Sequence, residues 1–84
     1  MNDKALVEIL LAASGQRFDV YIPLDVKMFL VVKLVASAVS SLSNGTYMVS
    51  GKEVLCDEKT GELIDINKEA AELGIRNGSH LVLI

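Results

Sequence analysis

The sequence predicts an α+β roll, in which one main helix packs across a mixed sheet of four to five strands. Three segments support this prediction: an alternating hairpin over residues 5–23, one long segment with an apolar face over residues 26–43, and a very apolar last segment over residues 79–84. Side chains alternate along a strand and recur every 100° around a helix, which separates the two kinds of segment. A length of 84 residues indicates a single domain, residues 1–84.

Two strands joined by a short loop predict an antiparallel hairpin at the start of the chain. Glu8 must face water, which sets the side-chain alternation of the first strand (5–12). The inward positions of the two strands are then Val7, Ile9, Leu11, Phe18, Val20 and Ile22, and the outward positions of the second strand are Arg17, Asp19 and Tyr21. Pro23 ends the hairpin because proline has no N–H for the ladder.

The main helix is predicted over residues 26–43, with the Asp25 carboxylate as its N-cap. Its apolar face consists of Met28, Val31, Val32, Val35, Ala38, Val39 and Leu42. Many of these residues are β-branched, so the helix should depend on packing and not on intrinsic propensity. Asn44-Gly45 ends it, because glycine adopts positive φ readily.

The second half of the chain predicts short elements. A third strand is expected at 46–49, a fourth short segment at 53–56 and a polar loop at 57–62. Asn67 is expected to cap a short helix over residues 68–73 that stops at Gly74. The last strand, 79–84, is too apolar for a sheet edge and should lie in the middle of the sheet. A hairpin followed by a crossover helix is the start of a β-grasp domain.

Composition excludes several classes of function. The net charge is -3 and no run of Lys or Arg occurs, so the basic footprint of a nucleic-acid-binding protein is missing. One cysteine, Cys56, allows neither an internal disulfide nor a multi-cysteine metal site and fits a reducing compartment. The N-terminus does not resemble a signal peptide, and the longest apolar stretch is too short for a bilayer span. We therefore expect a cytoplasmic protein without membrane insertion.

No residue pattern predicts catalysis. His80 is the only histidine, it has no predicted Ser or Cys nucleophile beside it, and one histidine does not assemble a metal site. Cys56 is interpreted as a small, partly buried hydrophobic residue. The acidic loop 57–62 lacks the EF-hand spacing and is interpreted as a solvated turn. We therefore predict no catalytic residue, no metal and no cofactor, and the protein is not expected to be an enzyme.

The strand alternation predicts a binding surface on the sheet face that points away from the helix. Its candidate residues are Leu6, Leu10, Met48, His80, Val82 and Ile84. A contiguous exposed apolar patch marks an interaction surface, for a protein partner or for a second copy in a homodimer. Scattered apolar residues are also common on surfaces. Leu30 and Leu34, towards the polar side of the helix, form a second candidate surface, and the sequence does not choose between the two.

Two segments carry a resemblance to known proteins. Met48-Val49-Ser50-Gly51-Lys52-Glu53-Val54-Leu55 resembles a strand–Gly-Lys–strand hairpin of ubiquitin, and Glu72 to Leu83 resembles its terminal helix, turn and strand. Within the ubiquitin-like superfamily the chain is similar to the YukD/EsaB family of bacterial type VII (ESX-type) secretion systems. That similarity rests on Arg17-Phe18-Asp19-Val20-Tyr21-Ile22-Pro23 and on Leu73-Gly74-Ile75-Arg76-Asn77-Gly78.

The resemblance implies an accessory or regulatory role in protein export, exerted by protein binding. A partner in the membrane-anchored apparatus is implied, because a related domain begins a membrane component of the actinobacterial system. Sulfur carriers and modifiers activate a flexible Gly-Gly tail, whereas here the predicted strand extends to Leu83 and Ile84. C-terminal conjugation is therefore not expected. The remaining alternatives are such a carrier or modifier and a β-grasp adaptor unrelated to secretion.

Overall fold

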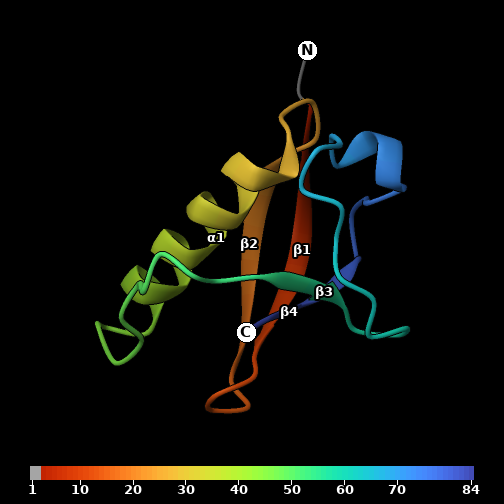
Figure 1. The fold of residues 1–84 in the computed structure, drawn as a ribbon. Coiled ribbons are helices and arrows are strands. Elements are labelled where there is room, and N and C mark those ends of the chain that lie inside the picture. Colours follow the sequence, from red (N-terminus) through yellow and green to blue (C-terminus); the bar gives the residue numbers. More distant parts are fainter. Residues whose placement is uncertain (1–2) are drawn as a thin grey trace.

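The computed structural model describes residues 3–84 and consists of a four-stranded sheet with one helix across it. The strands are β1 (Lys4–Leu11), β2 (Arg17–Pro23), β3 (Leu55–Asp57) and β4 (His80–Leu83). Their order in the sheet is β2-β1-β4-β3, so β4 lies in the middle, as predicted. β1 and β4 are parallel and the other two pairs are antiparallel, which makes the sheet mixed. Figure 1 shows this arrangement.

One face of the sheet is covered by helix α1 (Met28–Leu42), which runs across it diagonally in Figure 1. The predicted inward residues of the hairpin lie on this side; among them Ile9 and Ile22 are fully buried, and Phe18 is partly buried against the core. Burial of these side chains provides the main stabilisation of the fold. The hairpin prediction is confirmed. No helix within residues 3–84 has the length and apolarity that a bilayer crossing requires.

The apolar face of α1 is mostly as predicted, with two corrections. Ala36 is fully buried, although the sequence analysis left it off this face. Leu42 is 54% exposed, because it lies in the last turn, where the helix reaches beyond the sheet. After the helix, Asn44 and Gly45 both adopt positive φ, of 56° and 80°, so the predicted helix stop is confirmed.

The start of α1 differs from the prediction. The N-cap is Lys27, not Asp25, and no side chain caps the helix. The first helical N–H groups instead donate to backbone carbonyls of a distant loop: Met28 to Lys68 at 2.9 Å and Phe29 to Ile66 at 3.1 Å. Free N–H groups at a helix start need acceptors, and here the fold supplies them from another segment. The predicted carboxylate cap was therefore wrong.

The predicted third strand at 46–49 does not form, and the sheet has four strands. Polar side chains determine the path of this segment: Ser43 accepts the N–H of Tyr47 through its hydroxyl, and the Glu53 carboxylate accepts bonds from Tyr47, Ser50 and Gly51. Such local side-chain bonds compete with a strand ladder. The fourth predicted segment, at 53–56, corresponds to β3, shifted to Leu55–Asp57.

The predicted helix over residues 68–73 is one 3₁₀ turn, η1 (Ala71–Leu73). Asn67 does not cap it, because the Asn67 N–H bonds the Asp65 carboxylate and the N-cap position is Ala70. Gly74 ends the turn with φ of 76°, as predicted. The following Asn77-Gly78 turn attaches to β1, since the Asn77 side-chain oxygen accepts the Leu6 N–H at 2.7 Å and the Gly78 N–H donates to the Leu6 carbonyl.

Candidate functional site

The sheet face opposite α1 carries the candidate surface, and the strand register orders its residues in rows. One row crosses β2, β1 and β4 as Asp19, Glu8 and His80, because Glu8 pairs with both of the others. It continues to Glu58, directly after β3, whose N–H donates to the His80 carbonyl. The next row is Arg17, Leu10, Val82 and Cys56. Val54 and Ile84 exchange two backbone hydrogen bonds and begin the third row. A polar row therefore lies beside an apolar region.

Four residues of this region form what we call the outer patch: Leu10, Val54, Val82 and Ile84. Leu10 and Val82 are paired across β1 and β4 and are half-buried. Ile84 is 62% exposed and Val54 39%. Cys56 faces the same side beside Val82 but is buried, as the sequence analysis expected. The structure thus brings together three of the predicted contact residues, Leu10, Val82 and Ile84, and adds Val54.

The other three predicted contact residues lie outside this patch. Leu6 is on the same face, but Glu8 separates it from Leu10, and its partner across the hairpin is Tyr21. His80 belongs to the polar row. Met48 is 80% exposed, yet it lies in the loop before β3, so the strand register that assigned it to this face was wrong. Its place in a contact remains a prediction.

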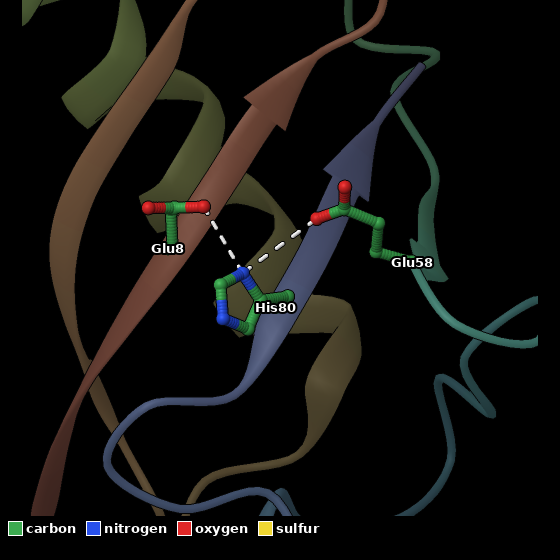
Figure 2. Close-up of side chains that lie close together, drawn as sticks. All are labelled: Glu8, Glu58 and His80. Atoms are coloured by element: carbon green, nitrogen blue, oxygen red, sulfur yellow. Dashed lines mark hydrogen bonds and ion pairs between the residues drawn. The ribbon is translucent and has the colours of Figure 1, made fainter.

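A polar network links the strands beside the outer patch, and the sequence analysis did not predict it. The Arg17 guanidinium donates to Glu8 Oε1 at 2.7 Å and to Glu58 Oε2 at 2.8 Å, so this side chain from β2 reaches a carboxylate beyond β3. His80 Nδ1 lies 3.0 Å from Glu8 Oε1 and 3.7 Å from Glu58 Oε1. Figure 2 shows His80 between the two carboxylates. The network ties the loop after β3 to the first hairpin.

The charges of this network shift its ionisation equilibria. Hydrogen bonding to Arg17 lowers the pKa of the Glu58 carboxyl below its usual value. The hydrogen bonds of Arg17 to Glu58 and Glu8 raise the pKa of the guanidinium, which stays charged at any physiological pH. One guanidinium thus faces two carboxylates in this network.

Within residues 3–84, one group of side chains has the spacing of metal ligands, and it consists of Glu8, Glu58 and His80. One ligand atom each from Glu8, Glu58 and His80 lie within 4.8 Å of one another. Two carboxylates and an imidazole suit a divalent transition metal ion. The carboxylate oxygens, however, already accept hydrogen bonds from Arg17, so a metal ion would have to displace a bound cation. The arrangement therefore acts as an ion-pair network.

A cleft of about 830 Å³ adjoins this network and is lined by charged residues and by the loop that precedes β4. Lys59, in the loop after β3, and Arg76, in the loop before β4, both line it. Asp57, also at its wall, accepts the N–H groups of Lys59 and Thr60, and these bonds, the Thr60 bond most strongly, lower the pKa of its carboxyl. The loop 57–62 is thus the turn that the sequence predicted. Among the described residues that line the cleft, Ser79 alone carries a hydroxyl and none carries a thiol; the Ser79 hydroxyl accepts the Arg76 N–H.

The helix side offers the second predicted surface. Leu30 and Leu34 are 44% and 51% exposed, one helical turn apart. Phe29, at 43%, and Ile66, at 49%, are joined by a backbone hydrogen bond and are also exposed. Apolar side chains are therefore exposed both on the outer sheet face and on the helix side. The fold alone does not determine which of these two surfaces binds a partner.

The arrangement of the helix and the strands defines the fold class. A mixed sheet with one helix across it is the β-grasp, and comparison with solved structures confirms it as ubiquitin-like. The amino-acid sequence matches no protein-family profile and no curated protein. Similarity to known proteins is therefore seen in the fold.

Ubiquitin-like domains of type VII secretion proteins are among these neighbours. The ubiquitin-like domain of the Mycobacterium tuberculosis type VII secretion system protein ECCD1 matches with a TM-score of 0.76 and 17% identity, over 96% of this chain and 97% of that one. A chain of an ESX-5 inner membrane complex matches with a TM-score of 0.69 and 17% identity; 98% of this chain is covered, but only 21% of that chain.

A chain of a toluene 4-monooxygenase complex also has this fold. It matches with a TM-score of 0.75 and 16% identity, over 95% of both chains. At identities this low, the three similarities show a common fold. Which role this chain has must be argued from its own residues.

Proposed function

We propose that the chain is a non-catalytic accessory or regulatory protein of a bacterial type VII (ESX-type) secretion system and a member of the YukD/EsaB family. It acts by protein–protein binding in the cytoplasm. Its partner is a membrane-anchored component of the secretion apparatus. Support comes from the segments that resemble YukD/EsaB proteins and from the fold shared with domains of type VII secretion components.

The observation that carries the proposal is the outer patch. Leu10, Val82, Val54 and Ile84 form neighbouring rows on a sheet face that no element of residues 3–84 covers. Burying apolar area contributes roughly 25 cal/mol per Å², so a patch of this kind favours association. The polar network beside it supplies fixed charges, which in protein interfaces orient the partner more than they add affinity. Leu6, Met48 and His80 are proposed to extend the contact.

Replacing Val82 or Ile84 with Asp tests this surface. Ile84→Asp changes a side chain that is 62% exposed, so the fold should remain intact, as circular dichroism would show. Val82→Asp changes the half-buried centre of the patch and should have the larger effect on binding. Leu34→Asp is the matched control, since Leu34 is 51% exposed on the opposite, helical side.

The tagged variants would be purified with their partners from detergent-solubilised membranes of the native bacterium. We expect a membrane component of the secretion system with the wild-type protein and with Leu34→Asp, and its loss with both patch variants. Sedimentation of the pure protein separates a heteromeric partner from a homodimer. Loss of the partner with Leu34→Asp alone would show that the contact lies on the helix side. A partner that binds the outer patch but is unrelated to secretion would favour a β-grasp adaptor with a different role.

A further inference from the structure

The two edges of the sheet differ in whether their backbone groups are paired. The outer edge of β3 is covered by residues 62–64, because the Ile64 N–H donates to the Leu55 carbonyl and the Asp57 N–H to the Glu62 carbonyl, both at 2.9 Å. β2, at the opposite edge, has seven residues and no strand or bridge on its outer side within residues 3–84. Long, unpaired edge strands are templates for pairing with another chain.

The hydrogen-bond pattern identifies the free groups of β2. In an antiparallel pair, hydrogen-bonded and non-bonded residue pairs alternate. The bonds at the two ends of the hairpin, from the Leu24 N–H to Asp3 and from the Leu11 N–H to Gln16, fix the phase of this alternation. The even-numbered residues of β2 therefore bond to β1. The odd-numbered ones, Arg17, Asp19 and Tyr21, direct their backbone N–H and carbonyl groups to the open edge.

A groove runs beside this open edge, between β2 and the last turns of α1. It has a volume of about 350 Å³ and is lined by Asp19, Val20, Tyr21, Ala38, Ser41 and Leu42. Its helix wall contains no charged residue, and Leu42 there is 54% exposed. A strand added at the edge would alternate its side chains, so every second one would enter this largely apolar groove.

We propose that β2 binds an extended segment of a partner protein by strand addition, with the segment running antiparallel to β2. The segment alternates apolar residues, which fill the groove, with polar residues, one of which is a Lys or Arg opposite Asp19. Asp19 forms no ion pair with any residue of 3–84, while its neighbour Arg17 is engaged by Glu8 and Glu58. The free charge at the edge is thus negative, and opposite charges on facing strands stabilise pairing. Main-chain bonds provide affinity in this mode, and the groove provides selectivity.

A synthetic heptapeptide, Val-Thr-Val-Lys-Val-Thr-Val with blocked ends, is the probe. Titration followed by amide NMR spectra should shift the signals of Arg17, Asp19 and Tyr21 and slow their hydrogen exchange. Two further peptides carry three backbone N-methyl groups each. Methylation at the Thr and Lys residues removes the N–H groups that face β2 and should abolish binding. Methylation at three of the Val residues leaves those groups free and should preserve it.

Two charge-reversal variants test the role of Asp19. Asp19→Lys should weaken peptide binding about five-fold, the equivalent of about 1 kcal/mol for a facing charge pair. Glu62→Lys makes the same charge change at an exposed loop residue on the other side of the sheet and should leave the affinity unchanged.

Several outcomes would overturn the proposal. Equal binding of the two N-methylated peptides would exclude a backbone ladder at this edge. Peptide-induced shifts at Val82 and Ile84 without shifts in β2 would place the peptide on the outer patch. A dimer of the pure protein, in which the Arg17, Asp19 and Tyr21 amides are already protected from exchange, would show that a second copy occupies the edge. The outer-patch variant Ile84→Asp should still bind the heptapeptide, so this test and that of the proposed function can fail independently.

Discussion

At the scale of single residues, a few charged side chains determine local structure that their own segments do not encode. Glu53 organises the loop before β3, since its carboxylate accepts the Tyr47 hydroxyl and the N–H groups of Ser50 and Gly51. The Tyr47 bond is the largest cause that lowers the pKa of Glu53, to about 2. Burial, followed by the bond to Glu53, raises the pKa of Tyr47 to about 12.

These shifts predict how stability depends on pH. A carboxyl with a lowered pKa stabilises the fold above its unfolded pKa and loses this contribution as pH falls through the folded value. For Glu53 the loss therefore extends from about 4.5 down to about 2. Tyr47 acts in the opposite direction: its contribution is present below pH 10 and is lost as pH rises towards about 12.

Tyr47→Phe tests this coupling. Removing the hydroxyl should cost about 1 kcal/mol of unfolding free energy at pH 7, the usual contribution of a hydrogen bond. It should cost less at pH 3, because loss of the Tyr47 bond raises the pKa of Glu53, so the folded variant binds protons there more readily than the wild type. Urea unfolding at the two pH values measures the difference, and other carboxyls cancel in the comparison with wild type. A cost that is the same at both pH values would contradict the coupling.

Arg17 offers a second residue-scale test. Replacing it with Met removes the main cause that lowers the pKa of Glu58, so the pKa of that carboxyl should rise towards its ordinary value. NMR titration of the side-chain carboxyl carbon measures this directly. Arg76→Met is the control, since it removes the same charge from the wall of the same cleft without breaking the bidentate pair. An equal rise of the Glu58 pKa in both variants would show that the positive charge near the cleft, and not the hydrogen bonds from Arg17, causes the shift.

At the scale of elements, the start of α1 shows how tertiary structure replaces a local signal. Asp25 is a favourable N-cap residue in the sequence, but the carbonyls of residues 66 and 68 accept the helix N–H groups. Asp25→Ala should therefore change the unfolding free energy by less than about 0.5 kcal/mol, as expected for a surface substitution. A true cap would cost about 1 kcal/mol. Thermal or urea unfolding distinguishes the two values.

Structural features that depend on neighbouring residues in one segment could be predicted from the sequence, and features that depend on distant segments could not. The hairpin and the helix face were predicted because a period of two or 3.6 residues is set within one segment. The central position of β4 was predicted from its apolarity. The predicted strand at 46–49 was wrong, because Ser43 and Glu53, which lie outside the segment, both form hydrogen bonds with Tyr47.

The candidate site was predicted in part for the same reason. Leu10, Val82 and Ile84 follow from strand alternation once the last strand is central. The polar network joins residues 8, 17, 58 and 80, and only the strand register brings these together. The charges themselves are visible in the sequence, but nothing local pairs Arg17 with Glu58, which lies 41 positions further along.

At the scale of the whole molecule, the two surfaces proposed to bind protein partners lie on different parts of the sheet. The outer patch is an apolar area on the open face of the sheet, beside a fixed group of charges. The free edge of β2 is a set of unpaired backbone groups at the sheet's end. Binding at both would let one small domain connect two proteins, a property that suits an accessory subunit of a larger assembly.

We propose that the outer patch contacts a membrane component of a type VII secretion system. Site-specific photo-crosslinking in the native bacterium would detect this contact, with a photoreactive amino acid at position 84 and, as the control, at position 34. We predict a crosslink from position 84 to a membrane protein of the secretion system and none from position 34. A crosslink to that protein from position 34 alone, or crosslinks from position 84 only to proteins outside the secretion system, would contradict the claim.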